Sequence, residues 1–398
     1  MKNYTFIILL LVLAACEDQV EVTYRYARPY FLSKEYPIFW DASDQFVDIQ
    51  VKPFINPDKA FKIVSNEYYY FVGEKMKGIH VYKKTDAYQT SPLCFIECKS
   101  LKAFDVKEDM LYCNNFIDLL VVDVGNPLQA KIIHRERDFF NRYSNSRYNY
   151  PSSETGRLYI IGYKQVILTG KETQKDRVPD FSEYDKLYGN IIVKQIPDSL
   201  QSNIPVVGIA NAEGEIYTFG TSSLDLCSYA SGVFKSTPTA ISFPSYPYVS
   251  LDNLVYKNGT FFFFWNNIYF SIPSSEYNQH GPAGTVLFDV VPLIKRETNY
   301  LALSDNYIVG FFIAGESVNF DSKESYGATS LLNVNDTILA LGDQLRLYSC
   351  YNQFIGEVKQ YPAISGTAML QESNKLIVVN KEGLSIYDIS DLRNIIQR

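Results

Sequence analysis

The sequence predicts an all-β protein assembled from about seven copies of a small antiparallel sheet. Three observations lead to this prediction. The chain of 398 residues contains 32 Tyr and 26 Phe, and aromatic rings fit pleated sheets better than helices. Short alternating strands occur in pairs separated by a few residues, which is typical of hairpins. These pairs recur along the chain, whereas no extended helical periodicity does.

The four clearest hairpins set the period of the repeat. They combine residues 68–72 with 78–82, 110–114 with 118–122, 337–341 with 344–348, and 375–380 with 383–387. The aligned positions Ile79 and Leu119 are 40 residues apart, and Leu345 and Leu384 are 39 apart. This spacing, with four short strands per repeat, is that of β-propeller blades.

Weaker copies occupy the middle of the chain. They combine residues 157–163 with 165–169, 215–219 with 224–229, 260–265 with 267–271, and 307–313 with 317–321. Two stretches, 170–200 and 232–247, fit no blade well. We therefore expect a single propeller of about seven four-stranded blades, with six and eight as the alternatives.

The two ends of the repeat region predict how the ring closes. The last repeat stops after its third strand, at residues 388–394, whereas residues 45–52 (QFVDIQVK) alternate like a strand before the first full repeat. The N-terminal strand would complete the last blade and remove an exposed sheet edge. The predicted domains are a signal peptide (1–15), a tether and lead-in (16–44), and a propeller (45–398) with insertions near 137–156 and 170–200.

The first sixteen residues, MKNYTFIILLLVLAAC, predict the location of the protein. Lys2 gives a short positive region, and residues 6–14 are apolar. This run is too short to span a membrane, which takes about 20 residues, so it is interpreted as a signal peptide. The ending Leu13-Ala14-Ala15-Cys16 resembles the lipobox of bacterial lipoproteins, which implies lipidation of Cys16 and attachment to the membrane through that lipid.

The residues after the lipobox refine this address. Glu17-Asp18 resemble the export signal of Bacteroidetes surface lipoproteins. The resemblance implies an outer-membrane lipoprotein at the cell surface, with the periplasmic face as the alternative. The formal net charge of −7 gives no basic field for nucleic acid, so we expect no nucleic-acid partner.

Several segments resemble the LVIVD-repeat proteins. The matching stretches are KGIHVY (77–82), MLYCNNFIDLLVVDVGNP (110–127) and KLIVVNKEGLSIYDIS (375–390), and LYIIGYKQV (158–166) is similar to a segment of bacteroidetal members. About half of the mature chain carries the resemblance. It implies a β-propeller, often a cell-surface lipoprotein, and no particular chemistry.

The cysteine and histidine pattern predicts neither a complete disulfide framework nor a metal site. Five cysteines follow Cys16, an odd number that cannot pair fully. Cys94 and Cys98 would lie too far apart along one strand, and the sequence leaves a Cys98–Cys113 pair open without supporting it. The three histidines are isolated from one another. We expect buried free thiols, no metal and no cofactor.

Two aspartates sit at the same position of the repeat, just past its third strand. Asp123 and Asp388 precede turn sequences, and we expect each carboxylate to accept hydrogen bonds from amides of its own turn. A metal-binding role is the alternative, but the recurrence of the position favours a structural one.

The sequence carries no recognised catalytic motif. The nucleophile elbow, the HExxH helix, the Walker loop and the GxGxxG turn are absent. With 44 Asp and Glu, a carbohydrate-active enzyme using two carboxylates in the propeller centre stays as the alternative. We favour a binding or scaffold module for an envelope protein or glycan, without catalysis.

One loop stands out as a ligand-binding candidate. Residues 139–151, FFNRYSNSRYNYP, interrupt the blade pattern and combine arginines with aromatic rings. Arg and Tyr dominate recognition hot spots because each offers a large area and a polar tip. A loop that folds back and caps the ring is the alternative. The candidate residues are Phe139, Phe140, Arg142, Tyr143, Arg147, Tyr148 and Tyr150.

Overall fold

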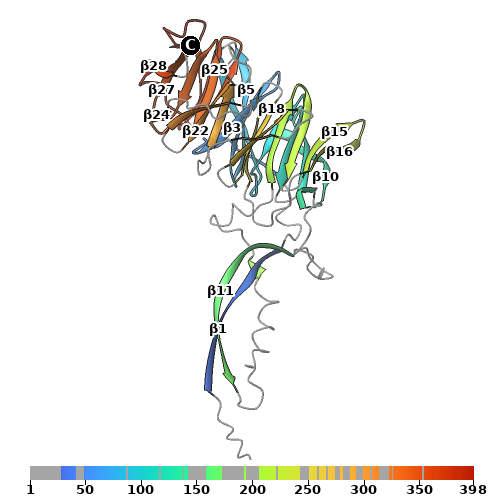
Figure 1. Cartoon of the computed structure of the whole chain (residues 1–398). Coiled ribbons are helices and arrows are strands. Elements are labelled where there is room, and N and C mark those ends of the chain that lie inside the picture. The colour runs from blue at the N-terminus through green and yellow to red at the C-terminus, as the bar shows by residue number, and fades with distance from the viewer. Residues whose placement is uncertain are drawn as a thin grey trace, which may run out of the picture. The chain divides into compact units, whose positions relative to one another are not determined.

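The computed structural model describes residues 28–41, 49–86, 88–115, 118–137, 139–141, 158–172, 192–193, 206–220, 223–242, 251–257, 260–265, 268–273, 278–280, 287–292, 299–304, 307–312, 322–324, 326–351 and 354–398. The chain divides into two compact units (Figure 1). Unit 1 comprises Met1–Asp41 and Leu158–Gln195, and unit 2 comprises Ala42–Arg157 and Ile196–Arg398.

Across its described residues, unit 2 consists of seven antiparallel sheets that follow one another along the chain, and each is called a blade here. Blade 1 contains β3 (Ala60–Ser65), β4 (Tyr69–Glu74), β5 (Gly78–Asp86) and β6 (Gln89–Glu97), with β2 (Gln50–Lys52) added beside β6. Blade 2 contains β7 (Phe104–Lys107), β8 (Met110–Asn115), β9 (Asp118–Asp123) and β10 (Lys131–Glu136). Blade 3 contains β13 (Val206–Ala212), β14 (Glu215–Gly220), β15 (Ser223–Ala230) and β16 (Val233–Ser242).

The second half of unit 2 repeats the same order of strands. Blade 4 contains β17 (Leu251–Lys257), β18 (Thr260–Trp265), β19 (Ile268–Pro273) and β20 (Asn278–His280). Blade 5 contains β21 (Leu287–Pro292), β22 (Asn299–Ser304), β23 (Tyr307–Phe312) and β24 (Ser322–Glu324). Blade 6 contains β25 (Ser330–Val334), β26 (Thr337–Leu341), β27 (Leu345–Tyr351) and β28 (Phe354–Tyr361). Blade 7 contains β29 (Ala368–Glu372), β30 (Lys375–Asn380), β31 (Gly383–Asp388) and β32 (Ile396–Gln397).

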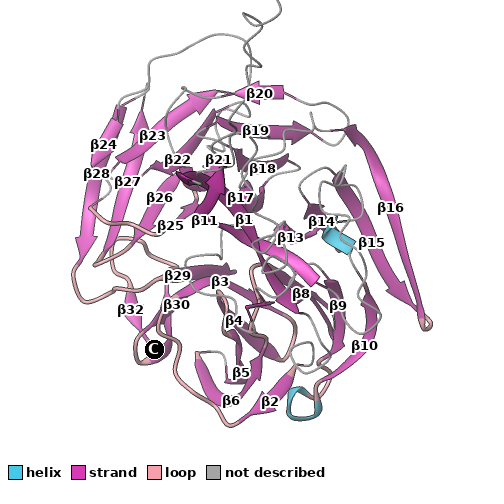
Figure 2. Ribbon diagram, turned by 90° about the horizontal axis from the view of Figure 1, so that it is seen from below, coloured by secondary structure: helices cyan, strands magenta, loops and turns pink. Residues whose placement is uncertain are grey.

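The first strand of every blade contacts the first strand of the next blade. This series runs through β3, β7, β13, β17, β21, β25 and β29, and β29 contacts β3 in turn. The seven blades therefore form a closed ring with their first strands innermost, as Figure 2 shows. The architecture is a seven-bladed β-propeller, and the fold class predicted from the repeats is confirmed.

The predicted hairpins are confirmed in six blades, and the one at 157–169 is wrong. The hairpin predicted for blade 5 cannot be compared in full, because its second strand, 317–321, lies outside the described residues. The second and third strands of blades 1, 2, 3, 4, 6 and 7 are the predicted pairs. In blade 5 the predicted strand at 307–313 is β23, and it pairs with β22 on one side and β24 on the other. Residues 157–169, expected to form a hairpin of an eighth blade, lie instead largely within one continuous strand of unit 1.

The expected closure by the N-terminal strand is also wrong. Residues 50–52 form β2, which pairs with β6 of blade 1 and not with blade 7. Blade 7 receives its fourth strand from the C-terminal end, because β32 pairs with β31. The ring closes through side-chain packing between blades 7 and 1, where Ile377 and Val379 lie in one core cluster with Tyr70 and Val72.

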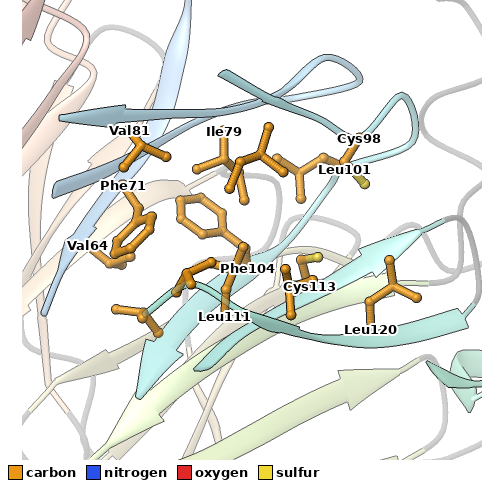
Figure 3. Close-up of a cluster of buried hydrophobic side chains, with 14 of the residues drawn as sticks. Val64, Phe71, Ile79, Val81, Cys98, Leu101, Phe104, Leu111, Cys113 and Leu120 are labelled. Atoms are coloured by element: carbon orange, nitrogen blue, oxygen red, sulfur yellow. The ribbon is translucent and has the colours of Figure 1, made fainter. Parts of the chain in front are cut away.

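Among the described side chains, core clusters lie between blades 1 and 2, 5 and 6, 6 and 7, and 7 and 1. Between blades 1 and 2, for example, Phe71, Phe104 and Leu111 are fully buried in one cluster (Figure 3). Gly73 has no side chain at the point where the Phe104 ring packs against β4. This close approach lets the two sheets pack face to face.

Unit 1 is built from two long strands that are far apart in the sequence. β1 (Arg28–Asp41) pairs antiparallel with β11 (Leu158–Glu172) over its whole length, and Asp41 lies opposite Leu158. The short β12 (Ile192–Val193) pairs in parallel with Phe39 and Trp40 of β1. The pair of strands β1 and β11 is called the ribbon below.

Helical structure is scarce among the described residues. It consists of the 3-10 helices η2 (Pro127–Gln129) and η3 (Phe139–Asn141). No helix within the described parts of the chain has the length and apolar character needed to cross a membrane.

Candidate functional site

The first two residues of the predicted binding loop are buried. Phe139 and Phe140 form η3, and their rings are 3% and 4% exposed. Their ring centroids lie 5.1 Å apart, and Phe139 also packs edge-on against Phe234 of blade 3. The two rings fill space beside blade 3, so they are not exposed to a ligand. Arg142, Tyr143, Arg147, Tyr148 and Tyr150 lie outside the described residues, as does Cys16.

Polar side chains connect the innermost strands at the propeller centre. The Lys62 ammonium on β3 lies 2.6 Å from Asp105 Oδ2 on β7. It also donates hydrogen bonds to the backbone carbonyls of Phe104, at 2.9 Å, and of Ile209 on β13, at 3.0 Å. One lysine therefore links the inner strands of blades 1, 2 and 3.

A second polar cluster joins the two ends of the ring. Glu372, at the end of β29, accepts hydrogen bonds from Lys84 Nζ at 2.8 Å, from the Tyr70 hydroxyl at 2.7 Å and from the Ser65 hydroxyl. Lys84 also lies 4.3 Å from the centre of the Tyr70 ring. Burial alone would raise the pKa of Glu372, but these three donors outweigh it and hold the pKa below its ordinary value.

A third cluster is buried in blade 1. His80 is fully buried, with its Nε2 2.9 Å from Glu74 Oε2 and its Nδ1 2.7 Å from the Ile55 carbonyl oxygen. Glu74 Oε1 accepts from the backbone amides of Lys59 and Asp58 and from Lys77 Nζ. Burial alone would raise the pKa of Glu74, yet these donors lower it. The cluster fixes the segment that leads into β3.

The predicted role of the two repeat aspartates is confirmed. Asp123 Oδ1 accepts a hydrogen bond from the Gly125 amide at 3.1 Å, and Asp388 Oδ1 accepts one from the Ser390 amide at 3.0 Å. The hydroxyl and amide of Ser390, together with Arg398, lower the pKa of Asp388 to about 2. Both carboxylates therefore stabilise turns.

Three carboxylates in these structural contacts have lowered pKa values: Glu74, Glu372 and Asp388. A general acid for sugar cleavage needs a raised pKa, so none of these three suits that role. No group of three or more His, Cys, Asp or Glu residues in the described part of the chain is arranged to hold a metal ion.

The ribbon of unit 1 presents apolar side chains to solvent. Phe31 on β1 is 67% exposed, and Ile167 on β11 is 71% exposed. Phe31 lies opposite Thr169 and Ser33 opposite Ile167, so all four side chains share one face of the ribbon. Gln165 on the same face donates a hydrogen bond to Ser33 Oγ at 2.9 Å.

The sequence alone did not predict the polar clusters around Lys62 and Glu372, nor the exposed face of the ribbon. Lys62, Lys84 and Glu372 belong to no motif, and each contacts residues of a different blade. The alternating apolar pattern of residues 158–168 was visible, but the pattern does not identify a partner strand.

Solved structures are similar in fold to this chain. The WD40 β-propeller domain of Doa1 matches with a TM-score of 0.50 and 10% sequence identity, over 90% of this chain and 98% of that one. A chain of the mitotic checkpoint complex matches with a TM-score of 0.50 and 10% identity, over 86% and 94%. A scan of the sequence against protein-family models gives no match, and neither does a search of curated protein sequences. At this identity the likeness establishes the β-propeller fold and nothing further.

Proposed function

We propose that this protein is a lipid-anchored β-propeller of the cell envelope that binds a partner protein and holds it at the outer membrane, at the cell surface. The lipobox-like ending at Cys16 and the resemblance to LVIVD-repeat lipoproteins support the anchor and the location. The likeness to solved β-propellers supports a propeller scaffold.

The exposed ribbon is the observation that carries this proposal. The described part of unit 1 is a small sheet of two long strands and the short β12, and so small a sheet is marginally stable in water without a packed face. The ribbon nevertheless exposes Phe31 and Ile167 on one face. A partner that covers this face would bury both side chains and stabilise the two strands.

The strand order of the ribbon favours a protein partner over a glycan. In the described residues of unit 1 the order is β11-β1-β12, and β12 covers β1 only at Phe39 and Trp40. Among the residues that the structure describes, no strand pairs with this edge along the remainder of β1. An extended segment of another protein can pair there through its backbone while its side chains cover one face.

The segment with Arg142, Tyr143, Arg147, Tyr148 and Tyr150 remains a second, separate binding candidate, because its arginines and aromatic rings are residue types favoured at recognition sites. It follows η3 in the sequence and precedes β11. Its contribution to binding is tested independently of the ribbon.

Crosslinking in intact cells, followed by pull-down of the lipidated chain through a C-terminal tag, tests the proposal. We expect one envelope protein in stoichiometric amount with the native chain. Phe31→Thr with Ile167→Thr should lower its recovery at least tenfold, because threonine keeps the preference for strands but removes the apolar contact. A combined alanine variant of Arg142, Tyr143, Arg147 and Tyr148 tests the loop separately.

The matched control changes exposed apolar residues on the propeller. Phe354 and Val358 on β28 are 68% and 60% exposed, so Phe354→Thr with Val358→Thr removes a similar apolar area outside the ribbon. This control should retain full recovery and the native melting temperature. Equal loss in both double variants, or full recovery with the ribbon variant, would refute the ribbon as the binding site.

A further inference from the structure

Two buried cysteines meet where blade 1 leads into blade 2. Cys98 directly follows β6, and Cys113 lies on β8, opposite Phe104 of β7. Their side chains are 2% and 1% exposed and belong to the same core cluster (Figure 3). Both cysteines therefore lie in the packed interior that joins the two blades.

A dense set of hydrogen bonds fixes the loop with Cys98 against the end of β8. Asn114 Oδ1 accepts from the amides of Lys102 and Ala103, both at 2.8 Å. Asn114 Nδ2 donates to the Ser100 carbonyl at 2.9 Å. Cys98 Sγ itself contacts the Asn114 carbonyl oxygen at 3.4 Å. These contacts place Cys98 beside the residue that follows Cys113.

The two thiols lie in one core cluster, with Cys98 Sγ against the backbone of the residue that follows Cys113. The neighbouring Cys98 thiol and burial raise the pKa of Cys113 well above its ordinary value. The other two cysteines described as free and buried have different neighbours, because Cys94 contacts the Pro127 carbonyl and Cys227 contacts Thr218.

We propose that Cys98 and Cys113 are a disulfide-forming pair that links blade 1 to blade 2 when the protein matures in an oxidising compartment. The pairing itself rests on the contacts above, whereas its occurrence in the cell rests on the proposed envelope location. A disulfide requires the two cysteines to be close, and the fixed loop keeps Cys98 beside the end of β8 that carries Cys113.

The reaction is a thiol–disulfide exchange with a disulfide oxidant, such as oxidised glutathione or an envelope dithiol oxidase. One cysteine thiolate attacks the oxidant's disulfide, giving a mixed disulfide and releasing one thiolate. The second cysteine attacks the bonded protein sulfur, so the S–S bond forms and the second oxidant thiolate leaves. Two electrons pass to the oxidant, and the two cysteine protons end on its thiols.

Burial determines when the bond can form. A thiol with a raised pKa and no contact with solvent reacts slowly with any oxidant. We therefore expect the bond to form before blades 1 and 2 pack against each other. The folded, reduced protein should react at least a hundredfold more slowly than the unfolded chain.

Oxidative refolding tests the pairing directly. The full chain is purified in detergent, reduced and unfolded, then refolded with reduced and oxidised glutathione. Free thiols are alkylated in denaturant, and peptides are mapped by mass spectrometry. We expect a crosslinked peptide pair with Cys98 and Cys113, and free Cys94 and Cys227. Reduction should lower Tm by about 5 °C, because the bond closes a loop of about 15 residues.

Matched variants separate this pair from the remaining thiols. Cys94→Ser with Cys227→Ser should keep the crosslink and the Tm difference, whereas Cys98→Ser with Cys113→Ser should abolish both. Free Cys98 and Cys113 in refolded wild-type protein, or a crosslink between other cysteines, would overturn the proposal. A crosslink after refolding with two free thiols in protein alkylated inside cells would instead count against the envelope location alone.

Discussion

The ring-closing cluster around Glu372 gives a prediction whose size follows from the structure. Glu372→Ala removes the acceptor for the Tyr70 hydroxyl, the Lys84 ammonium and the Ser65 hydroxyl. Tyr70 is 2% exposed, so its unpaired hydroxyl costs about 1–3 kcal/mol. The ion pair with Lys84 is partly exposed and adds about 0–1 kcal/mol. We expect a loss of about 2–4 kcal/mol in the free energy of unfolding.

Urea unfolding followed by circular dichroism measures this loss. A double-mutant cycle identifies its source, because Tyr70→Phe in the Glu372→Ala background removes the unpaired hydroxyl and should restore about 1 kcal/mol. Glu382→Ala, an exposed position on the same blade, serves as the control and should change stability by less than about 0.5 kcal/mol. A loss with Glu372→Ala as small as the control, or no recovery with Tyr70→Phe, would refute the reasoning.

Three further predictions use the same unfolding assay. Because the folded pKa values of Glu74 and Glu372 are lowered, both carboxylates stabilise the protein above their unfolded pKa of about 4.3. This contribution to the free energy of unfolding should be lost as the pH falls through the folded pKa values. Glu372→Gln should make the free energy of unfolding less dependent on pH in this range. The same pH dependence in the variant and the wild type would refute the prediction. Lys62→Met should lower the free energy of unfolding by about 2–3 kcal/mol, because Asp105 and two carbonyls lose their shared donor. A loss no greater than that of Lys381→Met, at an exposed position, would contradict this prediction. Gly366→Ala should lower the free energy of unfolding by about 1–3 kcal/mol, because a Cβ there would lie 2.6 Å from Val378 Cγ1 and even closer to the Val379 carbonyl oxygen. Gly356→Ala is the control, because a Cβ at Gly356 has room, and an equal loss in both variants would refute the prediction.

Local sequence signals predicted the blades because hairpins are local. The strands around Ile79, Leu119, Leu345 and Leu384 alternate, pair with strands a few residues upstream, and recur at a constant period. Turn aspartates such as Asp123 and Asp388 were predictable for the same reason, since donor and acceptor are two residues apart.

Pairings between distant segments could not be predicted in this way. Residues 158–168 alternate as a strand of a blade would, but their partner is β1. Residues 50–52 have the pattern of a closing strand, yet they pair with β6. The contacts of Lys62 with Ile209, and of Glu372 with Lys84, likewise depend on the order of the blades in the ring. Alternation specifies a strand and its faces, but it does not specify its neighbour.

The chain order of the ribbon has a consequence for synthesis of the protein. β1 leaves the ribosome early, but β11, its partner, follows only after blades 1 and 2 have been made. β1 therefore has no pairing partner while the strands of blades 1 and 2 are being synthesised. Unpaired strands are prone to aggregate. Closure of the ring is also late, because β3 can contact β29 only after blade 7 has been translated. The ring thus stays open throughout most of translation, so its blades must remain unaggregated until β29 has been made.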